Sequence, residues 1–382
     1  MGRCGPLLVP RVLLVTNDFP PTLGGIQSYL RDFLACLDPA EIVVFASTQD
    51  AAAARAHDAE APFRVIRWPR KVMLPTPATA REMARIIAEE GVETVWFGAA
   101  APLAVMDGAA RQAGARRVIA STHGHEVGWA MLPGARQVLR IIGNRADVVT
   151  YISDYTLRRI RSAFGPRPRF AHLPSGVATE LFTPGTGASI RERLELGDGP
   201  LIVCISRLVP RKGQDQLLRV LPELRRRHPG TRLVIVGRGH YGRRLRAIAE
   251  SLQLADAAVF TGGLSFTDMR AVLATADIFA MPARTRGRGL DVEGLGIVYL
   301  EAQASGVPVV AGDSGGAPET VTPETGIVVD GRDLGALTEA LSRLLGDPAL
   351  RARMGRAGRA HVEAHWTWEI MGQRLRRLLA PM

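Results

Sequence analysis

The chain has 382 residues, enough for two domains with substantial cores, and its apolar content of 47% is typical of a globular protein. Its formal net charge of +11 suits partners such as nucleic acid, anionic lipid or a phosphorylated substrate. The three cysteines, Cys4, Cys36 and Cys204, have no paired spacing, which argues against a disulfide framework or a cysteine metal site and favours a reducing compartment.

The amino-terminal segment imitates a signal peptide. Pro10 and Arg11 interrupt its apolar run, and no small-residue cleavage site follows. Nothing approaches the ~20 apolar residues of a membrane-spanning helix. We therefore expect a cytosolic protein in which residues 11–17 form a buried strand.

The first half alternates short apolar runs with helical patterns. We expect strands at 11–17, 42–46, 63–68, 94–97, 117–120 and 148–152, and helices at 25–37, 79–90 and 102–113. This alternation predicts a mostly parallel sheet with helices on both faces and ligands at the carboxyl ends of its strands. Gly24 and Gly25 lie at the first strand-to-helix turn, where backbone amides can approach a phosphate or another polar ligand.

A histidine-rich stretch follows the fifth expected strand. His123, His125 and Glu126 lie close together there, but no further ligands at matching spacing indicate a metal site. A histidine at a strand end is about as often a hydrogen-bonded loop residue as a ligand-binding one, so both interpretations stay open.

Arg136 and Arg140 lie one helical turn apart and are interleaved with apolar residues. This pattern is that of a basic amphipathic helix, which suits the surface of an anionic membrane. A core-facing helix with a solvated outer face has the same pattern, and the pattern alone favours that second interpretation.

Residues 172–184 have the character of a domain boundary, and a second alternating series follows. We expect strands at 201–206, 233–236, 259–261, 278–281 and 307–311, and helices at 216–226, 334–345 and 365–379. The chain then has two α/β domains, residues 1–175 and 176–365, that face each other across a cleft. The last segment, residues 366–382, is expected to pack back on the first domain.

The strongest binding pattern lies at residues 290–304. Gly294 and Gly296 precede an expected helix, whose positive end and first amides form an anion site. Glu301 follows Glu293 by eight positions, roughly 12 Å along a helix at ~1.5 Å per residue. Carboxylates on both sides of an anion site suit a ligand with hydroxyl, phosphate and hydroxyl in sequence, as in a nucleotide sugar.

Two other patterns are weaker. Gly237-x-Gly239-x-x-Gly242 matches a dinucleotide fingerprint, but it lies deep in the second domain and in an arginine-rich setting. Asp291 and Glu293 resemble a pair of metal-binding carboxylates, but two carboxylates without further ligands do not form a metal site. Lys212 is more informative, because of the 48 cationic side chains only Lys71 and Lys212 are lysines, and Lys212 lies in a loop next to a glycine.

These motifs together resemble the retaining glycosyltransferases of family four. The motifs are the Glu293-Gly-Leu-Gly segment with Glu301, the loop at 207–213, the turn at 24–27 and the segment GVPVVAGDSGGAPE at 306–319. The resemblance covers almost the whole chain. It implies the GT-B fold, in which two Rossmann-like domains enclose the active site.

Four stretches narrow the resemblance to the actinobacterial transferases that add a second mannose to phosphatidylinositol monomannoside. They are TNDFPPTLGGIQSYL, STHGHEVGW, SRLVPRKGQD and RTRGRGLDVEGLGIVYLEA. The implied reaction moves α-mannose from GDP-mannose to the inositol and gives the α-1,6 dimannoside without a metal. At residues 176–178 the chain has Gly-Val-Ala, where the family usually has Gly-Val-Asp.

The resemblance also implies a role for each matching residue. Arg207 and Lys212 would hold the donor diphosphate, and Glu301 would bind the ribose. Glu293 would bind the mannose. The other implied contacts are the amides of Gly294, Leu295, Gly296 and Ile297 at the diphosphate, the backbone near Leu264 at the guanine, Gly24 and Gly25 at donor and acceptor, and His123 at the transferred mannose.

The chemistry agrees with this site, because fixed cations and amides can stabilise the charge on the leaving diphosphate without a metal. No carboxylate is placed as an obvious nucleophile, so we favour attack by the acceptor hydroxyl on the same face. The implied location is cytoplasmic, peripheral on the inner face of the plasma membrane, with Arg136 and Arg140 as candidate contacts to anionic lipid.

Three other functions remain open. The first is a related transferase with another donor, such as a UDP-sugar, or another lipid acceptor. The second is a nucleic-acid binder, which the aromatic content of 5% and the lack of aromatics between the cations disfavour. The third is a sugar-nucleotide-binding regulator without turnover.

Overall fold

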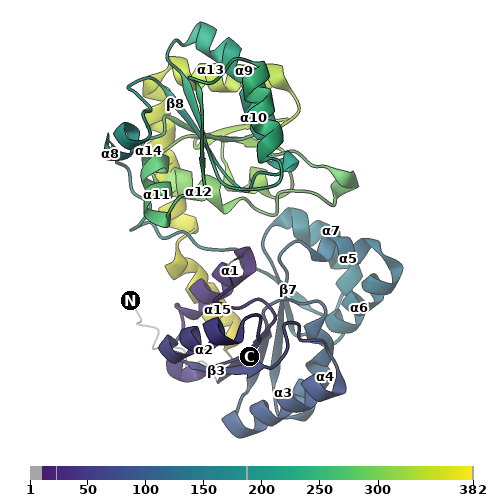
Figure 1. Ribbon diagram of the computed structural model, residues 1–382. Helices are drawn as coiled ribbons and strands as arrows, with labels where there is room; N and C mark the ends of the chain where they lie inside the picture. Colours follow the sequence, from purple (N-terminus) through teal and green to yellow (C-terminus); the bar gives the residue numbers. More distant parts are fainter. Residues whose placement is uncertain (1–10, 23, 186–187, 381–382) are drawn as a thin grey trace, which may run out of the picture. The chain divides into compact units, whose positions relative to one another are not determined.

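The computed structural model describes residues 11–22, 24–185 and 188–380, so Cys4 and the signal-like segment before Arg11 lie outside it. The chain divides into two compact units (Figure 1). The first unit comprises Met1–Gly176 and Trp368–Met382, and the second is Val177–Thr367.

The first unit is built on a seven-stranded sheet with the order β3-β2-β1-β4-β5-β6-β7, in which every pairing is parallel. Its strands are β1 Val12–Thr16, β2 Ile42–Ser47, β3 Arg64–Trp68, β4 Thr94–Phe97, β5 Arg117–Ser121, β6 Val148–Tyr151 and β7 Arg169–His172. Six of the seven were expected; β7 was missed because Arg169 and His172 leave it only two apolar residues.

The helices of the first unit connect these strands along the chain and flank the sheet (Figure 1). They are α1 Gly25–Leu34, α2 Ala51–Glu60, α3 Pro77–Glu90, α4 Asp107–Gln112, α5 Glu126–Met131, α6 Pro133–Gly143 and α7 Asp154–Phe164, with the short 3-10 turns η1 Pro39–Glu41 and η2 Leu103–Met106. The expected helix at 102–113 is therefore split between η2 and α4.

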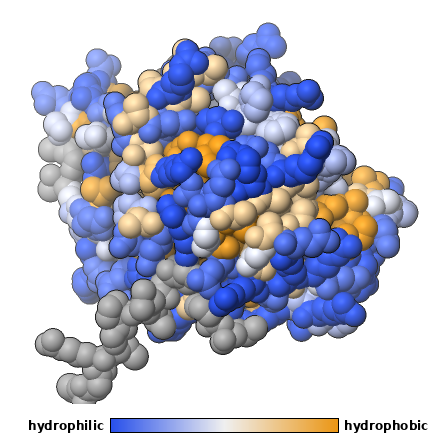
Figure 2. All heavy atoms as spheres, turned by 90° about the horizontal axis from the view of Figure 1, so that it is seen from below, coloured by the Kyte–Doolittle hydropathy of each residue, from blue (hydrophilic) through white to orange (hydrophobic). Residues whose placement is uncertain are grey.

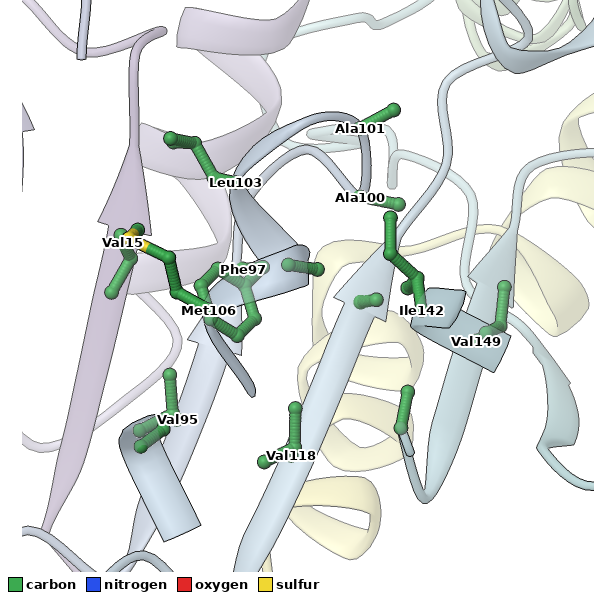
Figure 3. Close-up of a cluster of buried hydrophobic side chains, with 14 of the residues drawn as sticks. Val15, Val95, Phe97, Ala100, Ala101, Leu103, Met106, Val118, Ile142 and Val149 are labelled. Atoms are coloured by element: carbon green, nitrogen blue, oxygen red, sulfur yellow. The ribbon is translucent and has the colours of Figure 1, made fainter. Parts of the chain in front are cut away.

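Alternate residues of the strands point to opposite faces of the sheet. Val15, Phe97 and Val118 point to the face covered by helices such as α6, where they form a buried cluster with Met106 and Ile142 (Figure 3). The aliphatic character of the strands thus follows from burial on both faces of a parallel sheet.

The other face carries the C-terminal helix α15, Trp368–Leu379, beside α1. The Trp368 ring lies 5.1 Å from that of Phe33 on α1, and Gly372 leaves no room for a Cβ, which would lie 2.7 Å from the Cβ of Cys36. The return of the C-terminal helix to the first domain is confirmed. Its expected start at His365 was wrong, because α14, Pro348–His365, ends there and α15 begins at Trp368.

The second unit has a six-stranded parallel sheet with the order β10-β9-β8-β11-β12-β13. Its strands are β8 Leu201–Ile205, β9 Arg232–Val236, β10 Ala258–Gly262, β11 Ile278–Met281, β12 Val309–Gly312 and β13 Gly326–Val329. The expectation missed β13 and placed β12 two residues too early.

Helices flank the second sheet as well (Figure 1). They are α8 Ala188–Arg193, α9 Gln214–Arg227, α10 Gly242–Ser251, α11 Phe266–Ala274, α12 Ile297–Ala304, α13 Leu334–Gly346 and α14, with the 3-10 turns η3 Pro210–Lys212, η4 Gly287–Gly289 and η5 Ala317–Thr320. The expectation of two Rossmann-like α/β domains is confirmed.

The face that Figure 2 views is mostly hydrophilic, with a few hydrophobic patches. Within the part of the chain that the structure describes, every helix is too short or too polar to cross a membrane.

Candidate active site

The start of α12 has the features of an anion site. Gly296 precedes the helix with φ 84°, and no side chain caps the helix. Among the described residues, no hydrogen bond occupies the amides of Leu295, Gly296 or Ile297. A Cβ at Gly296 would lie 2.5 Å from the Tyr299 ring, so both the space and the φ require glycine. Free amides at the positive end of a helix favour a phosphate.

Lys212 and Glu293 form an ion pair beside these amides. The Lys212 ammonium lies 2.5 Å from Glu293 Oε2, and the side chains are only 10% and 9% exposed. The contact is an ion pair without a hydrogen bond, because Glu293 Oε2 has no hydrogen-bond partner of suitable geometry among the described residues. Each charge neutralises the other where water is largely excluded. The ammonium has three donors, so it can serve a phosphate and the carboxylate together.

The loop after β12 fixes the backbone of Glu293. The Glu293 amide donates to the buried Ser314 hydroxyl at 3.2 Å, and its carbonyl accepts from the Gly316 amide at 3.0 Å. Gly315 lies so close that a Cβ would be 1.9 Å from the Glu293 carbonyl oxygen. This contact, together with a φ of 61°, explains the first glycine of the pair in the GDSGGAPE segment.

Glu301 lies on α12, and its carboxyl has no ion pair within the described residues. Burial raises the pKa of Glu301 to about 7. The helix begins only at Ile297, so the spacing estimated along a helix axis does not apply to Glu293. A half-buried carboxyl without a cation suits neutral hydroxyl groups.

Arg207 lies in the loop after β8, with an exposed side chain that makes no ion pair in the described part of the chain. The buried Gln214 donates to the Arg207 carbonyl at 3.0 Å and to Ser206 Oγ at 2.8 Å. Gly237 and Gly239 touch this loop so closely that a Cβ would lie 2.0 Å from the Ser206 carbonyl oxygen and 2.2 Å from that of Leu208. The glycines of the dinucleotide-like pattern therefore serve packing against the loop of Arg207.

Arg284 is a site residue that the sequence analysis missed. Its guanidinium contacts both oxygens of the buried Asp215, at 2.9 and 3.0 Å. Its amide donates to the Arg211 carbonyl at 2.8 Å, and Arg211 pairs with Asp291 at 3.3 Å. Arg284 thus ties the loop of Lys212 to the segment of Glu293. Arg284 and Asp215 are far apart in the sequence, so no local sequence pattern predicts their contact.

Leu264 is half-buried and lies between β10 and α11. Gly262 has φ 70°, and Ser265 caps α11 by accepting from the Asp268 amide at 3.0 Å. The backbone at Leu264 is therefore in a fixed turn at the carboxyl edge of the second sheet.

In the first unit, Gly24 and Gly25 begin α1 after β1. Gly24 is extended, and α1 has no side-chain cap. Gly25 is exposed, and a Cβ there would meet nothing within 4 Å, whereas one at Gly24 would lie 2.2 Å from Gln27 Oε1. Only the flexible end of the Gln27 side chain would have to move, so neither space nor φ requires glycine at Gly24 or Gly25.

His123 lies at the carboxyl edge of the same sheet. Its Nε2 lies 2.6 Å from the Gly98 carbonyl, and its ring packs edge-on against Tyr29 at 4.8 Å. The buried Glu126 accepts from the His123 amide at 3.0 Å. Burial lowers the pKa of His123. The neutral ring then carries its proton on Nε2, where the Gly98 carbonyl accepts it, and Nδ1 remains a hydrogen-bond acceptor.

Arg136 and Arg140 lie on α6 with half-buried side chains. Arg136 donates to the Ala130 carbonyl at 3.2 Å and to Ser162 Oγ at 3.1 Å, and Arg140 donates to the Ser162 carbonyl at 3.0 Å. Both guanidinium groups therefore hold α6 against α7. The structure gives them a packing role that the helical pattern did not reveal.

The described residues contain no group of three or more His, Cys, Asp or Glu side chains placed to hold a metal. A cavity of about 450 Å³ in the first unit is lined by residues of α1, α2 and adjacent loops, among them Leu34 on α1 and Phe19 in the loop after β1, and by none of the expected site residues. In each unit the candidate polar groups lie instead at the carboxyl edge of that unit's own sheet.

Two family models match the chain. Glycosyltransferase Family 4 matches residues 23–181, and Glycosyl transferases group 1 matches residues 188–361. The fold is similar to that of Anabaena Alr3699/HepE in complex with UDP, with a TM-score of 0.81 at 19% identity over 97% of this chain and 100% of that one. Sucrose-phosphate synthase from Thermosynechococcus elongatus has a TM-score of 0.78 at 23% identity, over 96% and 98%. The fold is therefore that of the GT-B glycosyltransferases.

Curated relatives are similar over nearly the full length. A Corynebacterium glutamicum protein, named GDP-mannose-dependent monoacylated alpha-(1-6)-phosphatidylinositol monomannoside mannosyltransferase, is 62% identical over 97% of both chains. A Mycolicibacterium smegmatis protein, named GDP-mannose-dependent alpha-(1-6)-phosphatidylinositol monomannoside mannosyltransferase, is 56% identical over 97% of this chain and 98% of its own. The chain belongs to this family of glycosyltransferases.

Proposed function

We propose that the chain is a retaining mannosyltransferase that moves α-mannose from GDP-mannose to the inositol of phosphatidylinositol monomannoside and gives the α-1,6 dimannoside. The main support is the 62% identity, over 97% of both chains, to a relative with that donor and acceptor in its name. The anion site at α12 with Lys212 suits the donor diphosphate.

In this proposal the second unit binds the donor. Arg207, Lys212 and the amides from Gly294 to Ile297 hold the diphosphate, and the turn at Leu264 contacts the guanine. Glu301 binds the ribose hydroxyls, and Glu293 binds the mannose. Because Glu293 contacts Lys212, the pair places a carboxylate for the sugar directly beside the cation for its phosphate.

The reaction breaks the bond between the anomeric carbon and the phosphate oxygen, and negative charge develops on the departing GDP. Cations and helix-end amides that are already oriented stabilise this charge without reorganising. A metal is not required for this step. We favour same-face attack by the acceptor hydroxyl, which transfers its proton to the leaving phosphate oxygen; trapping a mannosyl-enzyme adduct would contradict it.

The first unit binds the acceptor and the transferred sugar. The turn at Gly24 and Gly25 approaches donor and acceptor, and His123 accepts a hydrogen bond from a mannose hydroxyl through Nδ1. The enzyme works at the inner face of the plasma membrane as a peripheral protein. Arg136 and Arg140 add positive charge near anionic lipid, although their hydrogen bonds to Ala130 and Ser162 show that they also have a packing role.

The test is transfer of labelled mannose from GDP-mannose, without added metal, to phosphatidylinositol and its monomannoside in parallel, with UDP-glucose as the donor control. Product only from GDP-mannose and the monomannoside supports the proposal. Activity with another donor or acceptor contradicts the substrate assignment while the GT-B fold stands. Binding of GDP-mannose without transfer to either acceptor favours a regulator.

A further inference from the structure

The loop between β3 and α3 exposes two large apolar side chains. Val72 is 58% exposed and Leu74 is 54% exposed, whereas Met73 between them is fully buried. Arg70 and Lys71, the two preceding residues, are also exposed. We call residues 70–74 the basic–apolar loop.

The backbone of this loop is fixed by the core of the first unit. The side-chain amide of Asn17 donates to the Met73 carbonyl at 2.9 Å, and its oxygen accepts from the Met73 amide at 2.6 Å. The Thr48 amide donates to the Arg70 carbonyl at 3.0 Å. Since Met73 also belongs to the buried cluster, the alternation along the loop directs Val72 and Leu74 outward.

The cations of the loop are available to a partner. Within the described residues, neither Arg70 nor Lys71 has an ion pair. The pKa of Asp50 is lowered mainly by the hydrogen bonds from the amides of Ala53 and Ala52, which the Asp50 carboxylate accepts at the start of α2. Lys71 contributes only weakly to lowering this pKa. Rigid apolar side chains beside free cations match the boundary between lipid headgroups and acyl chains.

We propose that the basic–apolar loop docks the first unit on an anionic lipid bilayer. Val72 and Leu74 enter the acyl boundary, and Arg70 and Lys71 bind lipid phosphates. The loop follows the carboxyl end of β3 in a parallel sheet, so it lies at the edge that also carries the Gly24 turn and His123. Docking there brings this edge to the surface from which a lipid acceptor is taken. This last consequence rests on the proposed function.

A second exposed apolar pair, Met131 and Leu132, is the competing surface, 46% and 63% exposed. The cations near it are engaged by the protein: Arg136 donates to Ala130, and Arg159 contacts the Met131 sulfur at 3.6 Å. The basic–apolar loop therefore combines exposed apolar groups with free charge, which the other pair does not.

The experiment is co-flotation of the full chain with vesicles of phosphatidylcholine alone or mixed with phosphatidylinositol. Wild type should bind the anionic vesicles, and binding should fall as salt increases. The variants Val72→Ser/Leu74→Ser and Arg70→Glu/Lys71→Glu should each reduce binding at least tenfold without a change in unfolding temperature or GDP-mannose affinity.

Matched controls are Val328→Ser/Leu334→Ser in the second unit, with side chains 40% and 38% exposed, and Arg116→Glu, whose side chain is 82% exposed. They should bind vesicles like wild type. Absence of wild-type binding, unchanged binding of both loop variants, equal losses in the controls, or a loss confined to Met131→Ser/Leu132→Ser would overturn the proposal.

A second measurement reports insertion directly. A Leu74→Trp variant should show a blue shift of its tryptophan emission with anionic vesicles relative to wild type, and an unchanged spectrum would count against insertion. Neither flotation nor fluorescence requires sugar transfer. A wrong substrate assignment would therefore leave both readouts intact, and a wrong docking surface would leave transfer to a soluble, deacylated acceptor intact.

Discussion

Replacement of Lys212 by Met should affect stability and donor binding through the same buried contact. The substitution removes the ammonium that lies 2.5 Å from the Glu293 carboxylate, and the Glu293 side chain is only 9% exposed. The carboxylate is then left without its cation. Removal of one partner of a buried ion pair typically costs about 3–5 kcal/mol. For a unit of this size, that corresponds to a fall of roughly 10 °C in the unfolding temperature of the second unit.

The same variant should lose affinity for GDP. A hydrogen bond to a charged group contributes about 1.5–3 kcal/mol, so the dissociation constant should rise roughly 10- to 150-fold. Calorimetric titration with GDP measures this loss without an acceptor. Thermal unfolding of the same samples measures the stability.

The double variant Lys212→Met/Glu293→Gln separates the two effects. It removes both charges, so most of the lost stability should return, whereas the GDP affinity should stay low. Arg226→Met, whose side chain is 71% exposed, is the matched control and should behave like wild type in both measurements. The reasoning is refuted if Lys212→Met unfolds like wild type, or if the double variant is no more stable than the single one.

Three further predictions concern the surrounding site. Arg284→Gln should weaken GDP binding about tenfold, while Arg219→Gln, which removes another partner of Asp215, should change it less than twofold; equal effects in calorimetric titration would contradict the bridging role of Arg284. Because burial raises the pKa of Glu301 to about 7, its neutral form stabilises the fold relative to the unfolded chain below about pH 4.5, and this contribution is lost as pH rises through 7. Glu301→Gln should therefore be more stable than wild type at pH 8 but not at pH 4.5, and a constant difference in denaturant titrations would argue against it. His123→Ala should lower kcat at least tenfold at constant GDP affinity, whereas His123→Asn, which keeps an acceptor near the Nδ1 position, should retain more activity in initial-rate assays; equal losses would exclude that acceptor role.

The sequence predicted the fold class well, because parallel α/β architecture depends on local patterns. Runs such as Val95–Phe97 and Ile278–Met281 are continuously apolar because both sheet faces are covered, and the structure has strands at Thr94–Phe97 and Ile278–Met281 with the expected bounds. β7 was missed because it has only two apolar residues, whereas β13 was missed although three of its four residues are apolar. The helix α14 was not expected, and the last helix was started at His365, where α14 ends, because no glycine or proline marks that end in the sequence.

The sequence by itself also determined which chemical groups are present at the candidate site: glycines before α12, two carboxylates, and a lysine in an arginine-rich chain. Only the tertiary structure decided which of them meet. Lys212 contacts Glu293, Arg284 joins the loop of Lys212 to the segment of Glu293, and Arg136 turns inward to Ser162. Helical periodicity and motif spacing describe neighbours along the chain. Contacts between residues distant in sequence depend on how the strands are ordered in the sheet, and no local pattern encodes that order.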